Sequence, residues 1–491
     1  MSQTTSNYAS SHSGAPLPLR VAVVGAGISG LVAAYRLTEL SQQRNAGLEL
    51  LVVDASPRAG GVINTIHRDG FLIEAGPDGF VTDKPWALSL CKRIGLEDQL
   101  ISTNERHRGA MVVSEGRLVP IPPGFVLMAP GRIGSILRSP LFSWRGKLRI
   151  AMEPMVRAKR AVEDESLESF VMRRLGREAL DRLVQPLVGG IYTADAQKLS
   201  VLATFPRFLE MERTHGSLMR GMRHLARDAA HRQSTGARYS LFVTLRDGMR
   251  RLIDALVDQV GSAVFRLNTT ADSIERTNDQ WVLHCSGGSS HVVDGLLLAT
   301  PAHVAAPLVT CIDRALGDAI GRLRAASSVV VNLAYDRAVV GNALDTFGFV
   351  VPAREGRSII AGGFSSIKYA GRAPQGAALL RAFAGGELRP DIVDMGQDAL
   401  VDMVCREFED LLSITGRPRF AMVHRYARAM PQYDVGHVAR VSDIAAQATR
   451  HHGLALIGAA YDGVGIPDCV RAAEEAAQRV FDQLMSKDTS V

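Results

Sequence analysis

Three glycines near the start of the chain have the spacing of a turn that binds phosphate. Gly25, Gly27 and Gly30 form the pattern G-x-G-x-x-G, between a short β-branched run and a stretch with apolar residues at helical spacing. Gly25 permits a tight turn, Gly27 leaves the backbone open to a pyrophosphate, and Gly30 lets the helix pack closely on the strand. Ile28 and Ser29 then lie at a helix N-terminus, whose free N–H groups and partial positive charge attract phosphate.

A second apolar run follows the predicted helix and ends at an acidic residue. Residues 48–53 read LELLVV, and Asp54 comes directly after them. Strand, glycine turn, helix, strand and acid follow one another in the order that a Rossmann dinucleotide-binding unit requires. The carboxylate of Asp54 can accept hydrogen bonds from the ribose of an adenine nucleotide. The sequence therefore predicts a dinucleotide cofactor.

Two more glycine-rich stretches indicate which dinucleotide is bound. The first is SPRAGG at residues 56–61, and the second holds Gly70, Glu74 and Gly76 in the pattern G-x-x-x-E-x-G. A second close-approach glycine pair, with a guanidinium beside it, suits a cofactor that lies extended along its domain. The spacing resembles the extended signature of the flavin amine oxidase and desaturase superfamily, which implies FAD. The residues predicted to contact FAD here are Arg58, Gly60, Gly61, Gly76, Pro77, Asp78 and Gly79.

The far end of the chain repeats the strand, glycine turn and helix order. Residues 454–460 read LALIGAA, with Gly458 near their end, and the turn YDGVGIPD follows at 461–468. We expect the backbone N–H groups of Val464, Gly465 and Ile466 to face the flavin ring or its ribityl chain. Cys469 follows directly and is interpreted as a buried thiol, so the predicted FAD is noncovalent.

The chain is predicted to be α/β (α+β overall), with a Rossmann-type FAD-binding domain, a sheet-based substrate domain and an inserted helical membrane-binding domain. In the superfamily that the chain resembles, a middle segment returns to the cofactor domain, which places Ala271 against the adenine. The predicted divisions are a tail at 1–16, a discontinuous FAD-binding domain at 17–90, 236–304 and 425–491, a helical domain at 91–220 and a substrate domain at 305–424.

Composition excludes several classes of function. The formal net charge is +6, with no long basic run, so no nucleic-acid partner is expected. The five cysteines form no CxxC pair and no zinc-spaced cluster, so we expect no metal and a reducing, cytoplasmic compartment. No run of about 18 apolar residues predicts a transmembrane helix. Apolar and basic side chains alternate over residues 128–147, which favours peripheral contact with the inner face of a membrane.

From about residue 18 the chain resembles the oxygen-dependent protoporphyrinogen/coproporphyrinogen oxidase family. The motifs that carry the resemblance are VVGAGISGL, GPDGF, LVQPLVGGIYTADAQKLS, GFSSIKYAGRAP and YDGVGIPDCV. It implies FAD-dependent oxidation of a porphyrinogen, with O2 as acceptor, in haem biosynthesis. Protoporphyrinogen IX is the first choice of substrate. Coproporphyrinogen III is the rival, because its extra carboxylates would favour more cations in the pocket. Two further candidate functions are a flavin amine oxidase or desaturase, and a flavin-binding scaffold without turnover.

The resemblance also implies three substrate-binding residues. Arg108 lies where the family has an arginine that pairs with a propionate, with Arg117 as its rival. Gly190 matches a glycine near the macrocycle, and Phe364 matches an aromatic residue that packs on a pyrrole ring. Asp78 stands where some members have Arg or Asn. No acid or base is assigned, since the flavin can accept hydride directly. A homodimer is one option for the oligomeric state.

Overall fold

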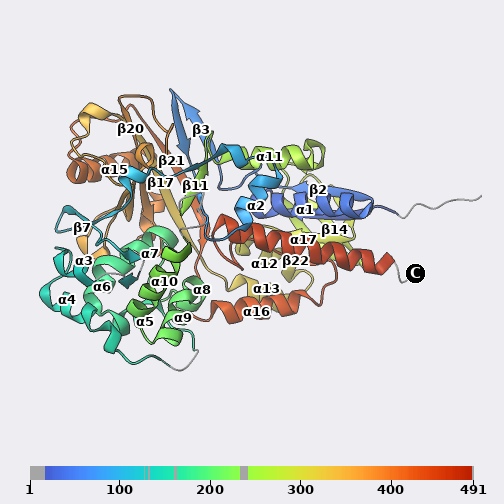
Figure 1. Cartoon of the computed structure of the whole chain (residues 1–491). Coiled ribbons are helices and arrows are strands. Elements are labelled where there is room, and N and C mark those ends of the chain that lie inside the picture. Colours follow the sequence, from blue (N-terminus) through green and yellow to red (C-terminus); the bar gives the residue numbers. More distant parts are fainter. Residues whose placement is uncertain (1–16, 127, 131–132, 160–162, 233–240, 489–491) are drawn as a thin grey trace, which may run out of the picture.

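Three groups of elements make up the chain (Figure 1): a parallel sheet flanked by α1 and α17, a larger sheet that contains β17 and β20, and a set of helices that includes α5 and α10. The predicted tail, residues 1–16, lies outside the described residues. The computed structural model describes residues 17–126, 128–130, 133–159, 163–232 and 241–488.

The first sheet is parallel throughout and draws its strands from distant parts of the chain. Its order is β12 (Phe265–Arg266), β2 (Leu48–Val53), β1 (Leu19–Val24), β16 (Gly295–Leu298) and β22 (Leu454–Leu456). Side chains alternate between the faces of a strand, so Val21 and Val23 of β1 pack on one side and Ala22 and Val24 on the other. Both faces are therefore buried, as in other parallel sheets.

Helices and a small sheet cover these two faces. The first face packs against α1 (Ile28–Arg44), α11 (Arg250–Val260) and α17 (Ile466–Asp488). The second packs against α12 (Ala302–Thr310), α13 (Arg314–Gly321), α16 (His437–Ala448) and the antiparallel strands β13 (Ala271–Thr277), β14 (Gln280–Cys285) and β15 (Ser290–Val293). Residues 264–304 thus supply β12, the antiparallel strands β13 to β15, and β16.

The second sheet has seven strands and is mostly antiparallel. Its order is β21 (Phe420–Pro431), β17 (Ala325–Asp336), β20 (Ala377–Gly385), β19 (Ala361–Phe364), β18 (Gly348–Val350), β7 (Met111–Ser114) and β8 (Arg117–Pro120). One face packs against α15 (Gln397–Leu412). The helical character predicted for 91–220 is wrong for β7 and β8, because the apolar Met111–Val113 run pairs with β18. Strand β21 likewise carries this sheet past residue 424, the predicted end of the substrate domain.

Most of the described residues from 133 to 220 are helical, as predicted, and the last helix continues to Arg232. The helices are α3 (Ile133–Arg138), α4 (Trp144–Ala151), α5 (Leu167–Arg174), α6 (Arg177–Ala179), α7 (Gln185–Tyr192), α8 (Val201–Thr204), α9 (Pro206–His215) and α10 (Leu218–Arg232). Helix α7 continues through Gly189–Gly190 and ends before Thr193, whose backbone is in the left-handed conformation. Within the described part of the chain, no helix is long and apolar enough to cross a membrane.

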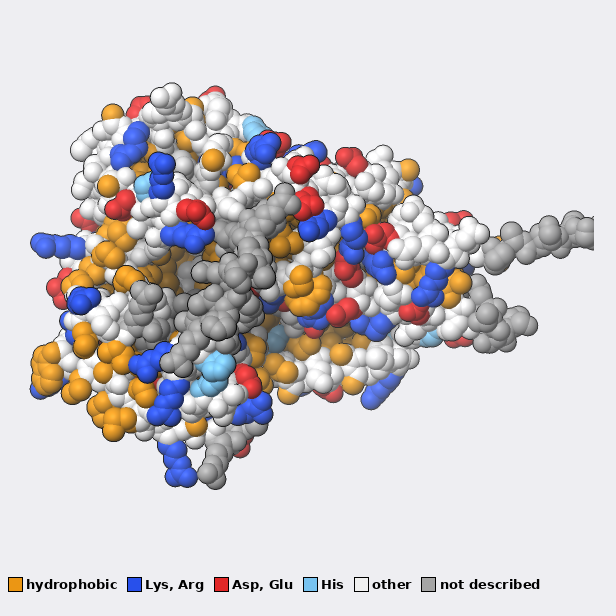
Figure 2. All heavy atoms as spheres, viewed as in Figure 1, with side chains coloured by type: hydrophobic (Ala, Val, Ile, Leu, Met, Phe, Trp, Pro, Cys, Tyr) orange, Lys and Arg blue, Asp and Glu red, His pale blue; other side chains and the backbone are white. Residues whose placement is uncertain are grey.

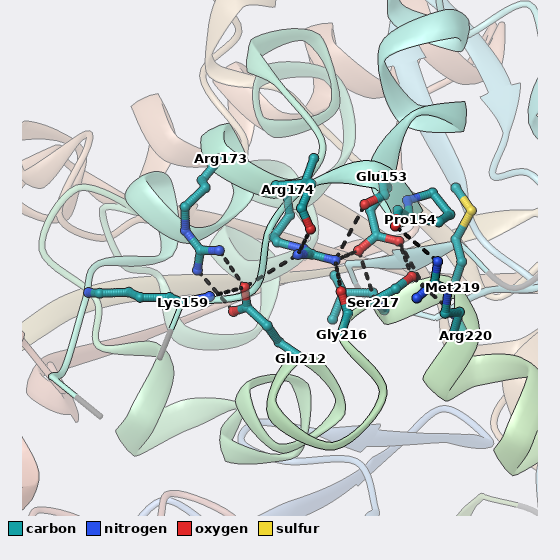
Figure 3. Close-up of polar contacts among 12 residues, drawn as sticks. Glu153, Pro154, Lys159, Arg173, Arg174, Glu212, Gly216, Ser217, Met219 and Arg220 are labelled. Carbon is teal, nitrogen blue, oxygen red and sulfur yellow. Dashed lines mark hydrogen bonds and ion pairs between the residues drawn. The ribbon is translucent and has the colours of Figure 1, made fainter. Parts of the chain in front are cut away.

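A buried ion-pair network ties these helices together (Figure 3). Arg174 and Glu153 are fully buried and paired, and Glu153 also accepts hydrogen bonds from the Leu218 N–H at 2.9 Å and the Ser217 hydroxyl at 2.6 Å. Arg174 donates in addition to Glu212 at 3.3 Å. Charges removed from water need partners on every side, so this network fixes how α5 meets the start of α10.

Short elements complete the fold. They are β3 (Thr65–Arg68), β4 (Phe71–Glu74), β5 (Phe80–Val81), α2 (Trp86–Arg93), β6 (Leu100–Ser102), β9 (Phe125–Val126), β10 (Ala129–Pro130), β11 (Phe242–Leu245) and α14 (Ser365–Lys368). Strand β11 pairs with β5 and β6, which brings residues after 241 back beside the segment that follows β4.

Candidate flavin and substrate site

The first glycine turn has the shape that a phosphate requires. A Cβ on Gly30 would lie 1.8 Å from the carbonyl oxygen of Gly25, so only glycine lets α1 approach the turn. Gly25 has φ +106°, a region that favours glycine. A Cβ on Gly27 would meet no atom within 4 Å. The space beside Gly27 is therefore open at the N-terminus of α1, which fits the pyrophosphate of a dinucleotide.

Asp54 and Arg58 both lie against this turn. Asp54 accepts hydrogen bonds from the N–H of Ala26 at 2.6 Å and of Ser56 at 2.7 Å, so it braces the turn from the end of β2. The guanidinium of Arg58 donates to the carbonyl of Gly61 at 2.9 Å. Burial, with the charge of nearby Arg250, lowers the pKa of Arg58.

The second glycine pair lies beside the first turn. Gly60 donates to the carbonyl of Ala26 at 2.7 Å, and a Cβ on Gly61 would lie 3.3 Å from the Cα of Gly27.

The segment predicted to contact the adenine lies next to Asp54. Thr269 donates its N–H to the Asp54 carbonyl at 2.9 Å, and Ala271 begins β13 two residues later. Ala271 is thus on the segment that runs past Asp54.

The C-terminal turn reaches the same place. Helices α1 and α17 lie side by side (Figure 1), and Ser29 at the start of α1 lies beside Cys469 near the start of α17. Val464, Gly465 and Ile466 therefore lie at an N-terminus close to that of α1. Burial raises the pKa of the Cys469 thiol to about 11, so it stays protonated at neutral pH.

Tyr433 and His437 hold the backbone that leads into this turn. Their rings are stacked, with centroids 4.0 Å apart. The Tyr433 hydroxyl donates to the carbonyl of Ala459, and Nε2 of His437 lies 3.4 Å from the carbonyl of Tyr461. Burial lowers the pKa of His437 to about 4, so the ring is neutral at physiological pH. Gly458, just before these carbonyls, has φ +129° and open space where a Cβ would stand.

The segment GPDG, residues 76–79, is packed between the first glycine-rich region and strands β11 and β20. A Cβ on Gly76 would lie 1.8 Å from the carbonyl oxygen of Val62, and one on Gly79 would lie 2.4 Å from that of Val243. Pro77 follows Gly76 on this segment. Arg381 donates to the carbonyls of Ala75 and Gly76, which anchors the segment to β20. Both close approaches explain why glycine stands at these positions.

A cavity of about 570 Å³ opens beside Asp78. Its walls carry five phenylalanine rings, among them Phe349 and Phe364 of the second sheet, whose centroids are 6.1 Å apart. Phe364 is fully buried. The charged lining residues are Asp78, Arg108, Lys368 and Arg381. An apolar cleft with a few charged groups is the usual form of a small-molecule site.

The predicted substrate residues meet this cavity to different degrees. Arg108 and Phe364 line it, whereas Arg117 is not among the lining residues. Gly190 sits one layer behind, since a Cβ there would lie 3.4 Å from a methyl of Val350, which does line it. The Arg108 guanidinium lies 3.3 Å from exposed Glu105, a weak surface contact that leaves it able to turn.

Sequence reasoning missed the roles of Lys368 and Arg381. Lys368 places its ammonium 2.9 Å from each carboxylate oxygen of Asp78. Although burial acts to raise it, Lys368, Arg381 and Arg372 together hold the pKa of Asp78 below its usual range. Lys368 stands four residues after Phe364 in the motif GFSSIKYAGRAP. This closeness in sequence to Phe364, a predicted substrate residue, is the signal from which Lys368 could have been predicted.

A parallel sheet with glycine turns at its edge, together with a second sheet that carries an apolar cavity, is the arrangement expected of a flavoprotein oxidoreductase. Residues 28–481 match the family described as flavin containing amine oxidoreductase. The chain belongs to this family, and within it to the protoporphyrinogen/coproporphyrinogen oxidases that its motifs resemble. It is therefore an enzyme that uses FAD, as predicted.

Similar proteins support this assignment over nearly the whole chain. Coproporphyrinogen III oxidase of Bacillus subtilis is 32% identical over 95% of this chain and 98% of that protein. Chloroplastic protoporphyrinogen oxidase of Nicotiana tabacum is 29% identical over 93% of this chain and 84% of that protein. The crystal structure of a provisionally named protoporphyrinogen oxidase from Exiguobacterium sp. 255-15 has a TM-score of 0.83 and 28% identity, covering 95% of this chain and 99% of that one.

Proposed function

We propose that this enzyme oxidises coproporphyrinogen III to coproporphyrin III, with O2 as the final acceptor. The observation that carries the proposal is the charge of the cavity. Three cationic side chains and one carboxylate line it, which leaves a net charge of +2 among apolar rings. A porphyrinogen is a large apolar macrocycle with anionic carboxylates, and coproporphyrinogen III carries two more of these than protoporphyrinogen IX. The cations therefore favour the former.

Protoporphyrinogen IX, the first choice from sequence, is the second candidate. It is favoured by the accessible phenylalanine rings of the wall, Phe242, Phe347 and Phe383, since a macrocycle with vinyl groups gains from apolar contact. The relatives named for the two substrates are 32% identical in Bacillus subtilis and 29% identical in Nicotiana tabacum, which supports the same order of preference.

The residues of the chain would bind and orient the substrate. When bound, FAD would supply the hydride acceptor, and the GPDG segment that contains Asp78 is among the residues predicted to hold it. The phenylalanine rings pack against the macrocycle, and the cations bind its carboxylates, which holds one carbon bridge in a fixed direction. No side chain is assigned as acid or base, because the reactive group belongs to the cofactor.

A fluorescence assay tests the proposed reaction. Purified holoenzyme receives each porphyrinogen separately in air, and the appearance of fluorescent porphyrin is followed. We expect coproporphyrin III to appear well above the rate without enzyme, and several-fold faster than protoporphyrin IX. If neither porphyrin appears faster than without enzyme, the proposed function is wrong. A faster rate with protoporphyrinogen IX would make the second candidate the function.

We also propose that the α3–α4 face makes peripheral contact with the inner face of an anionic membrane. Five large apolar side chains are exposed there, including Trp144 at 69% and Met155 at 80%. Figure 2 supports this, since hydrophobic and basic side chains lie together over the part of the surface where Figure 1 places α4. Arg145 stacks on Trp144 with 5.3 Å between the guanidinium and the ring centroid. The other exposed members are Leu137, Leu148 and Met152.

Changing Trp144 and Leu148 together to serine is expected to weaken vesicle binding by roughly tenfold or more, because two large apolar side chains no longer enter the lipid interface. Co-sedimentation with vesicles that contain phosphatidylserine measures this. Val292→Ser, at an exposed apolar position on β15, is the matched control and should bind like wild type. Equal binding by all three proteins would contradict the proposed contact.

A further inference from the structure

We propose that Lys368 is the specificity-determining residue of the cavity: it binds a carboxylate of the substrate while Asp78 holds it in place. This inference rests on the proposed function and deepens it. It names the group that distinguishes porphyrinogens by their number of carboxylates. Lys368 lies at the end of α14, where the chain turns from β19 toward β20.

The geometry leaves Lys368 one hydrogen-bond donor for a ligand. An ammonium group has three N–H bonds. Two of them point to the Asp78 oxygens, each at 2.9 Å, and no third partner of Lys368 occurs among the residues that the structure describes. The side chain lines the cavity and is 22% exposed. A carboxylate in the cavity can therefore bind the third N–H without displacing Asp78.

The surroundings of Lys368 are already organised for an anion. Its ammonium lies 5.5 Å from the ring centroid of Phe242 and 5.1 Å from that of Tyr369, so apolar rings confine it. Arg381 lines the same cavity, is only 4% exposed, and its Nε has no partner in the described chain. Fixed cations in an apolar wall bind carboxylates more strongly than mobile surface cations do.

Asp78 holds Lys368 in position without removing the positive charge of the cavity. Its carboxylate stays ionised at neutral pH because Lys368, Arg381 and Arg372 hold its pKa low against the effect of burial. It neutralises one of the three cations, while Arg381 and Arg108 keep the net charge of the lining at +2. Asp78 also belongs to the GPDG segment predicted to contact FAD. A carboxylate on Lys368 would thus fix the macrocycle relative to the flavin.

The alternative is a purely structural role, in which the Asp78–Lys368 pair does no more than connect the GPDG segment to α14. The two roles differ in what they change. A structural tie acts on FAD content and on every ligand equally, whereas a carboxylate-binding group acts only on ligands that carry a carboxylate. Lys368→Met, Lys368→Arg and the control Lys198→Met separate them. Lys198 also pairs with a carboxylate, Glu387 at 3.3 Å, but does not line the cavity.

The experiment measures binding of three oxidised porphyrins to the FAD-loaded enzyme by fluorescence titration. Coproporphyrin III has four carboxylates, protoporphyrin IX has two, and deuteroporphyrin dimethyl ester has none. Losing one charge-assisted hydrogen bond should weaken coproporphyrin III binding to Lys368→Met by about 10- to 100-fold. Binding of the dimethyl ester should not change. Lys368→Arg should keep most of the wild-type affinity for coproporphyrin III, and Lys198→Met should match wild type throughout.

Each other result overturns the inference. Equal weakening of all three ligands, or loss of FAD absorbance in Lys368→Met, would show a structural tie. Unchanged binding of coproporphyrin III would show that Lys368 does not reach the ligand. If Lys368→Met does not fold, Lys368→Arg with weak coproporphyrin III binding and intact FAD content is the contradicting result. A wild-type enzyme that binds these porphyrins but oxidises neither porphyrinogen would instead refute the proposed function alone.

Discussion

Replacing Gly30 with alanine is expected to weaken FAD binding by about 100-fold or more, because the new Cβ would lie 1.8 Å from the Gly25 carbonyl oxygen. That atom is backbone and cannot move aside, so α1 would have to shift away from β1. The shift would displace the N–H groups at the start of α1 from the phosphates. FAD content by absorbance, and reconstitution of the apoenzyme with FAD, measure the loss.

Gly27→Ala is the matched comparison, because it adds the same atom three residues earlier. A Cβ there meets nothing within 4 Å, so the apoenzyme should unfold at the same temperature as wild type. FAD affinity should nevertheless fall, since the methyl would occupy the space left for the pyrophosphate. Gly134→Ala, in an open position on α3, should change neither property. Normal FAD content in Gly30→Ala would contradict our account of the turn.

Parts of the fold that depend on neighbours in sequence could be predicted. The turn at Gly25–Gly30, the strand that ends before Asp54 and the helix after Ile466 each show their pattern within about 20 residues. The steric reason for Gly30 is local too, since a Cβ there would meet Gly25, five residues earlier. Patterns of this kind can be recognised without knowledge of the rest of the chain.

Contacts between distant segments could not be predicted in the same way. Lys368 and Asp78 are 290 residues apart, and neither sits in a pattern that demands the other. The Met111–Val113 run looks like any short apolar stretch until β18 supplies its hydrogen-bonding partner. Family resemblance predicts Arg108 and Phe364 as substrate-binding residues, and both line the cavity, but it assigned no partner to Asp78. The charge of the cavity is therefore a property that only the three-dimensional arrangement reveals.

Replacing Glu153 with glutamine is expected to lower the free energy of unfolding by about 3–5 kcal/mol, because it breaks a fully buried ion pair. Arg174 would remain charged in the interior, and the carboxylate left to it in the described chain is Glu212 at 3.3 Å. Urea denaturation followed by circular dichroism measures the loss. Glu210→Gln, an exposed carboxylate on the same group of helices that is paired with Arg213, should leave the unfolding midpoint unchanged.

The double variant Glu153→Gln with Arg174→Met decides whether the loss comes from an unpaired charge. Glu212 would keep Arg173, which donates to it at 2.9 Å, so neither carboxylate nor guanidinium would be stranded. We therefore expect the double variant to be more stable than Glu153→Gln alone. Removing one member of a buried ion pair leaves an unpaired charge in the interior, which destabilises the fold more than removing both members. If the double variant is the less stable, the Glu153 contacts with Ser217 and Leu218 matter more than the ion pair.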